Sequence, residues 1–154
     1  MCQHQKVNLT CHFYVIIFLR EVDILMTPSK DSREMKVRVC RPALQDSHLL
    51  LPRYCQRSEL IRQILKLRWW DPEEPHVLDL AWSTIPETDL SELVVDDGIG
   101  LPDGLRVIFF IPSTSDTTIW VLGIRKVAEE FTEHMKAIYV GRSKIVLERM
   151  NEPE

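Results

Sequence analysis

Long hydrophobic runs are missing from this 154-residue sequence. The apolar stretch Phe13–Leu19 ends at Arg20 and Glu21, far short of the roughly 20 apolar residues that a membrane-spanning helix needs. It also lacks the small-residue cleavage site that follows the apolar part of a signal peptide. We therefore expect no membrane span and no membrane partner.

Cysteine is scarce, and its spacing is irregular. The sequence has four cysteines and no C-x-x-C pair, so the simplest expectation is reduced thiols in a cytoplasmic protein. The cysteines and histidines that lie closest together in the sequence are Cys2, His4, Cys11 and His12. Their spacing matches no familiar zinc pattern. Gly98 and Gly100 lack the further Gly and Lys of a phosphate-binding loop. We expect no metal and no small-molecule cofactor.

Positive charge is absent from one long stretch and abundant in another. Asp71–Asp103 carries ten acidic residues and no Lys or Arg, whereas Lys36–Arg68 carries eight Lys or Arg residues against Asp46 and Glu59. One interpretation is a basic and an acidic surface, each suited to a partner of opposite charge. The alternative is that the two blocks face each other or cover separate solvated faces.

The first 34 residues have little pattern, and residues 1–34 are interpreted as an N-terminal extension. Cys11–Met26 is compatible with a strand. Because a clear pattern begins only after Met35, both Met26 and Met35 are candidate translation starts. We expect residues 35–154 to form a single domain.

The centre of the chain predicts a run of antiparallel strands. Apolar and β-branched segments alternate with turns rich in Gly, Pro, Asp and Ser, which predicts strands at Leu90–Asp96, Leu105–Ile111 and Thr117–Gly123. The second of these is apolar on both faces and is therefore expected to be central. An alternating pattern also predicts a strand at Met35–Arg41.

Three helices are expected around these strands. They are Ala43–Leu51, a helix from an N-cap at Ser58 through Trp70, and Lys126–Met150. His76–Trp82 is left open as helical or extended. The predicted class is α+β, in which helices pack on a small antiparallel sheet made of one N-terminal strand and a three-stranded meander.

Three short motifs in this layout resemble the RelE/ParE toxin superfamily, including its HigB-like branch. Ser91–Leu93 resembles the opening of the family's first hairpin strand, Gly104–Phe109 its Arg-bearing strand, and Leu122–Lys126 the turn after its last strand. The order of strands and helices is similar to that of the family from about residue 36 to about residue 150. Two positions depart from the family pattern: Val94 replaces a common Arg, and Phe131 replaces a common Tyr.

The resemblance implies roles for several residues. Arg106 and Arg125 align with catalytic arginines of ribosome-dependent RNases, where a guanidinium matches phosphate oxygens. Since arginine is a poor base, a base or acid must come from elsewhere, and His134 is the chosen candidate, with Tyr139 and His76 as alternatives. RNA contacts are expected from Lys126, Arg62, Lys66 and Arg68.

The implied function is the toxin of a type II toxin–antitoxin system that cleaves mRNA on the ribosome. Its expected partners are a cognate antitoxin protein and ribosome-bound mRNA. The alternative is a non-catalytic module that acts on a protein target, as gyrase-poisoning relatives do, or only binds an antitoxin. A third interpretation is a degenerate member without toxicity, with both arginines in surface ion pairs.

Overall fold

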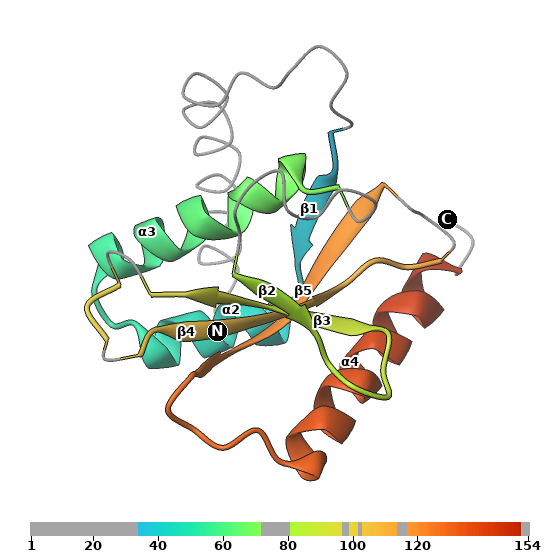
Figure 1. Ribbon diagram of the computed structural model, residues 1–154. Coiled ribbons are helices and arrows are strands. Elements are labelled where there is room, and N and C mark those ends of the chain that lie inside the picture. The colour runs from blue at the N-terminus through green and yellow to red at the C-terminus, as the bar shows by residue number, and fades with distance from the viewer. Residues whose placement is uncertain (1–33, 72–80, 97–98, 102, 114–116, 152–154) are drawn as a thin grey trace, which may run out of the picture.

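A five-stranded mixed sheet with helices on both faces forms the protein (Figure 1). This computed structural model describes residues 34–71, 81–96, 99–101, 103–113 and 117–151. The described elements are, in chain order, β1 (Lys36–Val39), α2 (Arg41–Leu50), α3 (Tyr54–Leu65), the 3₁₀ helix η1 (Lys66–Trp69), β2 (Trp82–Thr84), β3 (Leu90–Val95), β4 (Leu105–Phe110), β5 (Thr118–Lys126) and α4 (Glu133–Met150).

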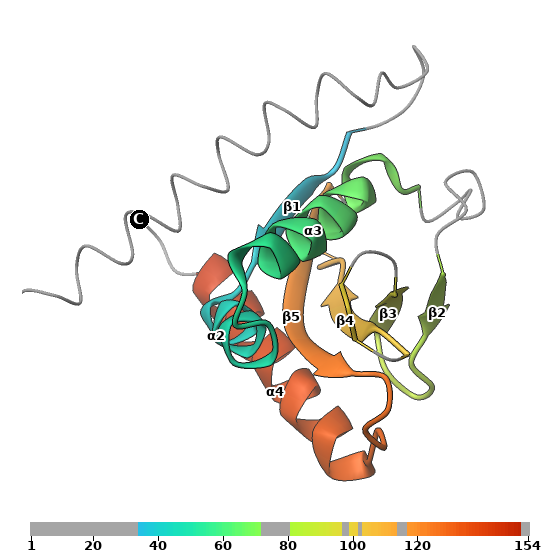
Figure 2. The same ribbon diagram turned by 90° about the vertical axis from the view of Figure 1, so that its left-hand side faces the viewer.

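The strand order is β1-β5-β4-β3-β2 (Figure 2). The α+β class is confirmed, and β4 is the middle strand, as its two apolar faces predicted. The pairs β2–β3, β3–β4 and β4–β5 are antiparallel, but β1 pairs with β5 in parallel. The fifth strand, β2, falls at the end of a segment that the sequence left open as helical or extended. The expected strand at Cys11–Met26 and the candidate His76 lie outside the described residues.

Two predicted helix starts are wrong. Helix α3 begins at Tyr54, with Arg53 as its N-cap, rather than at Ser58. Nothing between Pro52 and Ser58 breaks a helix, so the first turn forms before the predicted cap. Helix α4 begins at Glu133 rather than Lys126, because β5 continues pairing with β4 to the end of that strand. The helix starts where the Thr132 hydroxyl accepts a hydrogen bond from the Met135 backbone amide at 3.2 Å.

The sheet separates two apolar clusters, and α3 and α4 lie on its opposite sides (Figure 1). One cluster packs α2 and α3 against the sheet, through Leu60 and Ile64 among others, and includes Phe109 of β4. The other packs Tyr139 and Val146 of α4 against Ile108 and neighbouring residues. Among the described residues, no helix is both long and apolar enough to cross a bilayer.

A β-bulge at Leu122 changes the face on which the end of β5 presents its side chains. Opposite β4, Phe109 pairs with Val121 and Ile108 with Gly123, so Leu122 is the extra residue. Leu122 packs in the α4 cluster, and Gly123 also lies under α4, since a Cβ there would be 2.1 Å from Cε1 of Tyr139. Side chains beyond the bulge are therefore shifted by one position relative to simple alternation.

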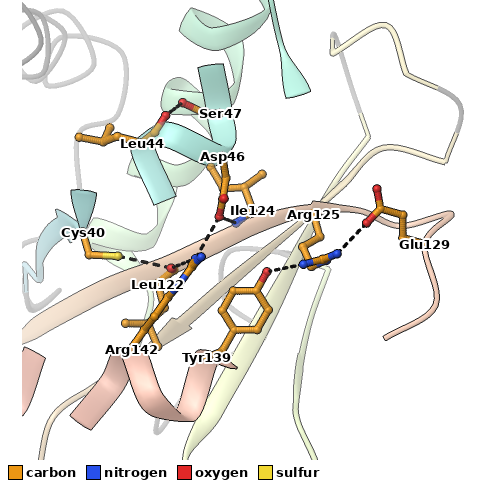
Figure 3. Close-up of polar contacts among 10 residues, drawn as sticks. All are labelled: Cys40, Leu44, Asp46, Ser47, Leu122, Ile124, Arg125, Glu129, Tyr139 and Arg142. Carbon is orange, nitrogen blue, oxygen red and sulfur yellow. Dashed lines mark hydrogen bonds and ion pairs between the residues drawn. The ribbon is translucent and has the colours of Figure 1, made fainter. Parts of the chain in front are cut away.

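Strand β5 extends beyond the end of β1, the strand that pairs with its outer edge. Strand β1 ends at Val39, opposite Val121, and side chains take over beyond that point (Figure 3). The Leu122 carbonyl accepts from Nη1 of Arg142 at 2.8 Å and from the thiol of Cys40 at 3.3 Å. The Ile124 amide donates to Oδ2 of Asp46 at 3.1 Å.

Asp46 and Arg142 also pair with each other, at 3.1 Å between Oδ2 and Nη1. Asp46 belongs to α2 and Arg142 to α4, so this ion pair joins the two helical layers around the open edge of β5 (Figure 3). Both side chains are about one quarter exposed. The pair therefore satisfies backbone groups that a longer β1 would otherwise have bonded.

Gly123→Ala is expected to destabilise the fold by about 1–3 kcal/mol, because its methyl group overlaps the Tyr139 ring. The matched control is Gly141→Ala in α4, where a Cβ meets nothing within 4 Å. It should stabilise the helix by about 0.5–1 kcal/mol. Urea unfolding measures both free energies, and equal effects of the two variants would contradict the close approach of Gly123 to Tyr139.

Asp46→Ala is expected to lower the free energy of unfolding by about 1–3 kcal/mol, because the Ile124 amide and Arg142 both lose an acceptor. Asp46→Asn keeps one acceptor oxygen and should cost less. His48→Ala, on an exposed position of the same helix, serves as a control expected within about 0.5 kcal/mol of the parent. If urea unfolding gives both aspartate variants the same free energy of unfolding as this control, the stabilising role of Asp46 at the edge of β5 is refuted.

Candidate functional site

Arg106 and Arg125 are direct cross-strand neighbours. Arg106 of β4 pairs in register with Arg125 of β5, which places the two side chains on the same face of the sheet. The bulge at Leu122 produces this arrangement. With strict alternation from Trp120, which packs in the α4 cluster, Arg125 would point to the α3 side; the extra residue turns it to the α4 side beside Arg106.

Arg106 is held by a carboxylate and an aromatic ring. Its Nη1 lies 2.7 Å from Oε2 of Glu92 on β3, and both side chains are less than one fifth exposed. The other carboxylate oxygen of Glu92 accepts from the Ser83 hydroxyl of β2 at 3.1 Å. The guanidinium carbon of Arg106 lies 5.2 Å from the ring centroid of Phe131. The strands β2, β3 and β4 thus fix its position.

Arg125 contacts a tyrosine and a second carboxylate (Figure 3). Its Nη1 donates to the Tyr139 hydroxyl at 3.5 Å, and its Nη2 lies 3.0 Å from Oε2 of Glu129. The Tyr139 hydrogen bond, with a smaller contribution from Glu129, raises the pKa of Arg125. The guanidinium therefore stays charged, and its side chain keeps 28% exposure.

Two stacked aromatic rings lie between two arginines beside the first half of α4. The Phe131 and Tyr139 rings are stacked with centroids 6.0 Å apart and an interplanar angle of 7°. Arg106 lies against Phe131, and Arg142 lies against Tyr139 at 5.1 Å. Phe131, which lacks a hydroxyl, thus packs under one arginine, while the phenol nearest to Arg125 comes from Tyr139.

Tyr139 is placed to fix Arg125 rather than to exchange protons. The residue is 1% exposed, and burial raises the pKa of its hydroxyl, outweighing the opposing effect of Arg125. His134, the predicted base, is exposed in the first turn of α4. No hydrogen bond or ion pair joins His134 to either arginine in the described part of the chain.

The predicted RNA-binding residues of α3 and η1 lie away from the arginine pair. Their elements pack on the opposite face of the sheet. Arg62 pairs with Glu59 at 2.6 Å, and this hydrogen bond holds the pKa of Glu59 below its ordinary value. Arg68 is 8% exposed and pairs with Glu34. These two side chains therefore do not share a face of the sheet with Arg106 and Arg125.

The remaining predicted RNA-binding cations are Lys66 and Lys126. Lys66 begins η1 and is half-buried, and Lys126 is exposed at the last position of β5. Lys126 follows Arg125 directly, so strand alternation directs it to the other face. Among the described residues, no group of three or more His, Cys, Asp or Glu side chains is placed to hold a metal ion.

Sequence reasoning missed the carboxylate partners of the two arginines. Glu92 was part of a recognised motif, but its contact with Arg106 depends on strand register, which the sequence left unassigned. Glu129 stands four residues after Arg125, and that spacing was a usable local signal, although Arg125 belongs to β5 and Glu129 lies after the strand, not in a helix.

The pKa of Tyr139 is expected to lie above its ordinary value of about 10, because the side chain is buried. Because the folded protein keeps this proton when the unfolded chain has lost it, the stability contributed by Tyr139 is intact below about pH 10 and declines above it. Tyrosinate absorbance during a pH titration measures this, and Tyr139→Phe should remove the component at highest pH. A titration curve whose late component survives in that variant would contradict the assignment.

Comparisons with known proteins find a similarity to a solved structure. No family model matches the chain, and no curated protein matches it. A search of solved structures finds the free state of the E. coli toxin RelE carrying two arginine-to-alanine substitutions, with 13% sequence identity and a TM-score of 0.47. The match covers 71% of this chain and 97% of that chain.

Proposed function

We propose that this chain is the toxin of a type II toxin–antitoxin system and that it acts on mRNA at the ribosome. The observation that carries the proposal is the cross-strand placement of Arg106 and Arg125 on one face of the sheet. Two adjacent guanidinium groups can bind one phosphate from two sides and stabilise the charge that develops on it during cleavage. The sequence motifs around both residues support the same assignment.

The ion pairs of the two arginines fit a site that exchanges partners. Glu92 and Glu129 each accept a hydrogen bond from one guanidinium. A phosphate can replace such a carboxylate, because two oxygens of either group can accept two parallel N–H bonds from an arginine. Glu129 is 42% exposed, so Arg125 is the guanidinium more readily released to a ligand. The cognate antitoxin is the expected partner that blocks this face in the resting complex.

A second function is favoured by one specific observation: in the described residues no exposed His or Tyr forms a hydrogen bond with the arginine pair, and the two carboxylates that do, Glu92 and Glu129, are each bound to a guanidinium. Tyr139 is buried and keeps its proton, and no hydrogen bond or ion pair joins the exposed His134 to either arginine in the described part of the chain. Under this alternative the chain binds a protein target, or an antitoxin alone, without cleaving RNA.

Induced expression in a bacterial host, followed by primer extension on mRNA, separates these functions. The proposed RNase predicts growth arrest with new mRNA ends. Arg106→Ala and Arg125→Ala should each reduce cleavage by about 10²–10³-fold, the effect of removing one preorganised donor from a developing anion. Arg106→Lys should restore only part of the activity, because lysine keeps the charge but loses the planar fork.

The matched control is Arg53→Ala, an exposed arginine at the N-cap of α3. It removes the same charge without touching the arginine pair and should leave growth arrest intact. Arrest without cleavage would support the protein-binding alternative. Arrest that persists in both Arg106→Ala and Arg125→Ala would show that the site is elsewhere, and no effect of the parent chain on growth would refute toxicity in that host.

A further inference from the structure

A second cationic region lies apart from the arginine pair. A cavity of about 720 Å³ is bounded by the end of β1, the start of α2, β5 and the last turns of α4. Four arginines contribute to its wall, and no Asp or Glu does. These arginines are Arg38, Arg41, Arg142 and Arg149. Neither Arg106 nor Arg125 lines this cavity.

Three of these arginines have no carboxylate partner among the described residues. In the part of the chain that the structure describes, the ion pairs involve Arg142 but not Arg38, Arg41 or Arg149. All three are exposed. Burial raises the pKa of the Cys40 thiol in the same wall, so this cysteine adds no negative charge near neutral pH. The cavity therefore has a strong net positive charge.

The start of α2 adds to the attraction for anions. Cys40, Arg41 and Pro42 are the N-cap and first residues of this ten-residue helix, and all three line the cavity. The Cys40 side chain makes no capping hydrogen bond to this helix, and no acidic residue stands in the first turn. Pro42 has no backbone N–H to donate, so the helix start contributes mainly the positive end of its dipole and the Arg41 amide.

The cavity also offers a flat aromatic surface. The guanidinium carbon of Arg38 lies 5.6 Å from the centroid of the Trp120 ring, and both residues line the wall. Ile145 and Met150 of α4 are exposed large apolar residues in the same wall. Such a surface accommodates a planar group beside the anion, as a nucleotide base does when it stacks.

We propose that this cavity binds a segment of single-stranded RNA, with phosphates on Arg38, Arg41 and Arg149 and a base against the Arg38–Trp120 layer. RNA is favoured over an acidic peptide for two reasons. The arginine fork and the helix start both match phosphate oxygens, and every nucleotide carries a base that can stack on the aromatic surface, whereas Asp and Glu side chains carry no ring. The proposal adds an RNA contact region to the proposed function but does not require cleavage.

The test measures binding of the full purified chain to a fluorescent 2′-O-methyl RNA oligonucleotide by anisotropy over a range of salt concentrations. The modified probe lacks the hydroxyl that RNA cleavage uses, so binding is read independently of catalysis. Arg38→Gln combined with Arg149→Gln should weaken binding by at least about tenfold and reduce the slope of log affinity against log salt by about 1.4, the value for two phosphate contacts on a single strand.

The matched control combines Arg53→Gln with Lys144→Gln. It removes two positive charges from exposed positions outside the cavity, one of them on α4, and should change affinity less than twofold. If thermal melts show that the first double variant is unfolded, Arg41→Gln with Arg149→Gln takes its place. Equal affinities of the cavity variant and the control variant would overturn the proposal.

Two further measurements separate this cavity from the other claims. Polyglutamate that binds more tightly than RNA, and loses affinity in the same cavity variant, would overturn RNA in favour of an acidic protein partner. Arg106→Ala with Arg125→Ala should abolish growth arrest but keep most of the oligonucleotide affinity. If the parent chain is not toxic yet the cavity variant still loses RNA, the proposed function fails and the RNA-binding cavity stands.

Discussion

The whole molecule depends on the satisfaction of backbone groups along β5. This strand is the longest in the described sheet and pairs with β4 on one side over most of its length. On its other side, β1 reaches only as far as Val121. A strand edge left bare inside a helical layer would bury polar groups without partners. Asp46 and Arg142 prevent this, and in doing so they bring α2 and α4 together at one edge of the sheet.

The same strand also determines the geometry of the candidate site. One extra residue at Leu122 shifts the later side chains, so that Arg125 lies beside Arg106 while Gly123 makes room for Tyr139. The tyrosine then contacts Arg125 and stacks on Phe131, which in turn packs under Arg106. Bulges next to functional sites commonly redirect a side chain in this way. The position of the arginine pair is thus a consequence of backbone register rather than of local sequence.

The sequence predicted most elements because their patterns are local. Alternation predicted β1, and apolar, β-branched runs between turns predicted β3 and β4. Strand β4 was expected at the centre because it is apolar on both faces. Helix starts were less predictable: α3 begins before its apparent cap at Ser58, and α4 begins late because β5 continues through Lys126. The parallel pairing of β1 and the strand β2 are long-range features, and no local pattern encodes them.

The candidate site was predictable only in part for the same reason. Arg106 and Arg125 could be singled out by motif, but their carboxylate partners follow from three-dimensional register. The cationic residues of α3 were grouped with them on charge alone, whereas the structure places α3 on the opposite face. A block of basic residues in sequence therefore does not define one basic surface, since the chain distributes its members over both faces of the sheet.

Both cationic regions, the Arg106–Arg125 pair and the cavity beside α2, contain arginines. They differ in how many carboxylates neutralise those arginines. Around Arg106 and Arg125, each guanidinium has one acidic partner, which holds it in the free protein and which a single phosphate can replace. Around the cavity, Arg38, Arg41 and Arg149 have no carboxylate partner in the described residues, which suits attraction of a longer polyanion. Arg142 lines the cavity and also lies against Tyr139, the residue that contacts Arg125. The two regions are therefore joined by a continuous chain of side chains through α4, and an RNA strand held at the cavity would engage one end of that chain.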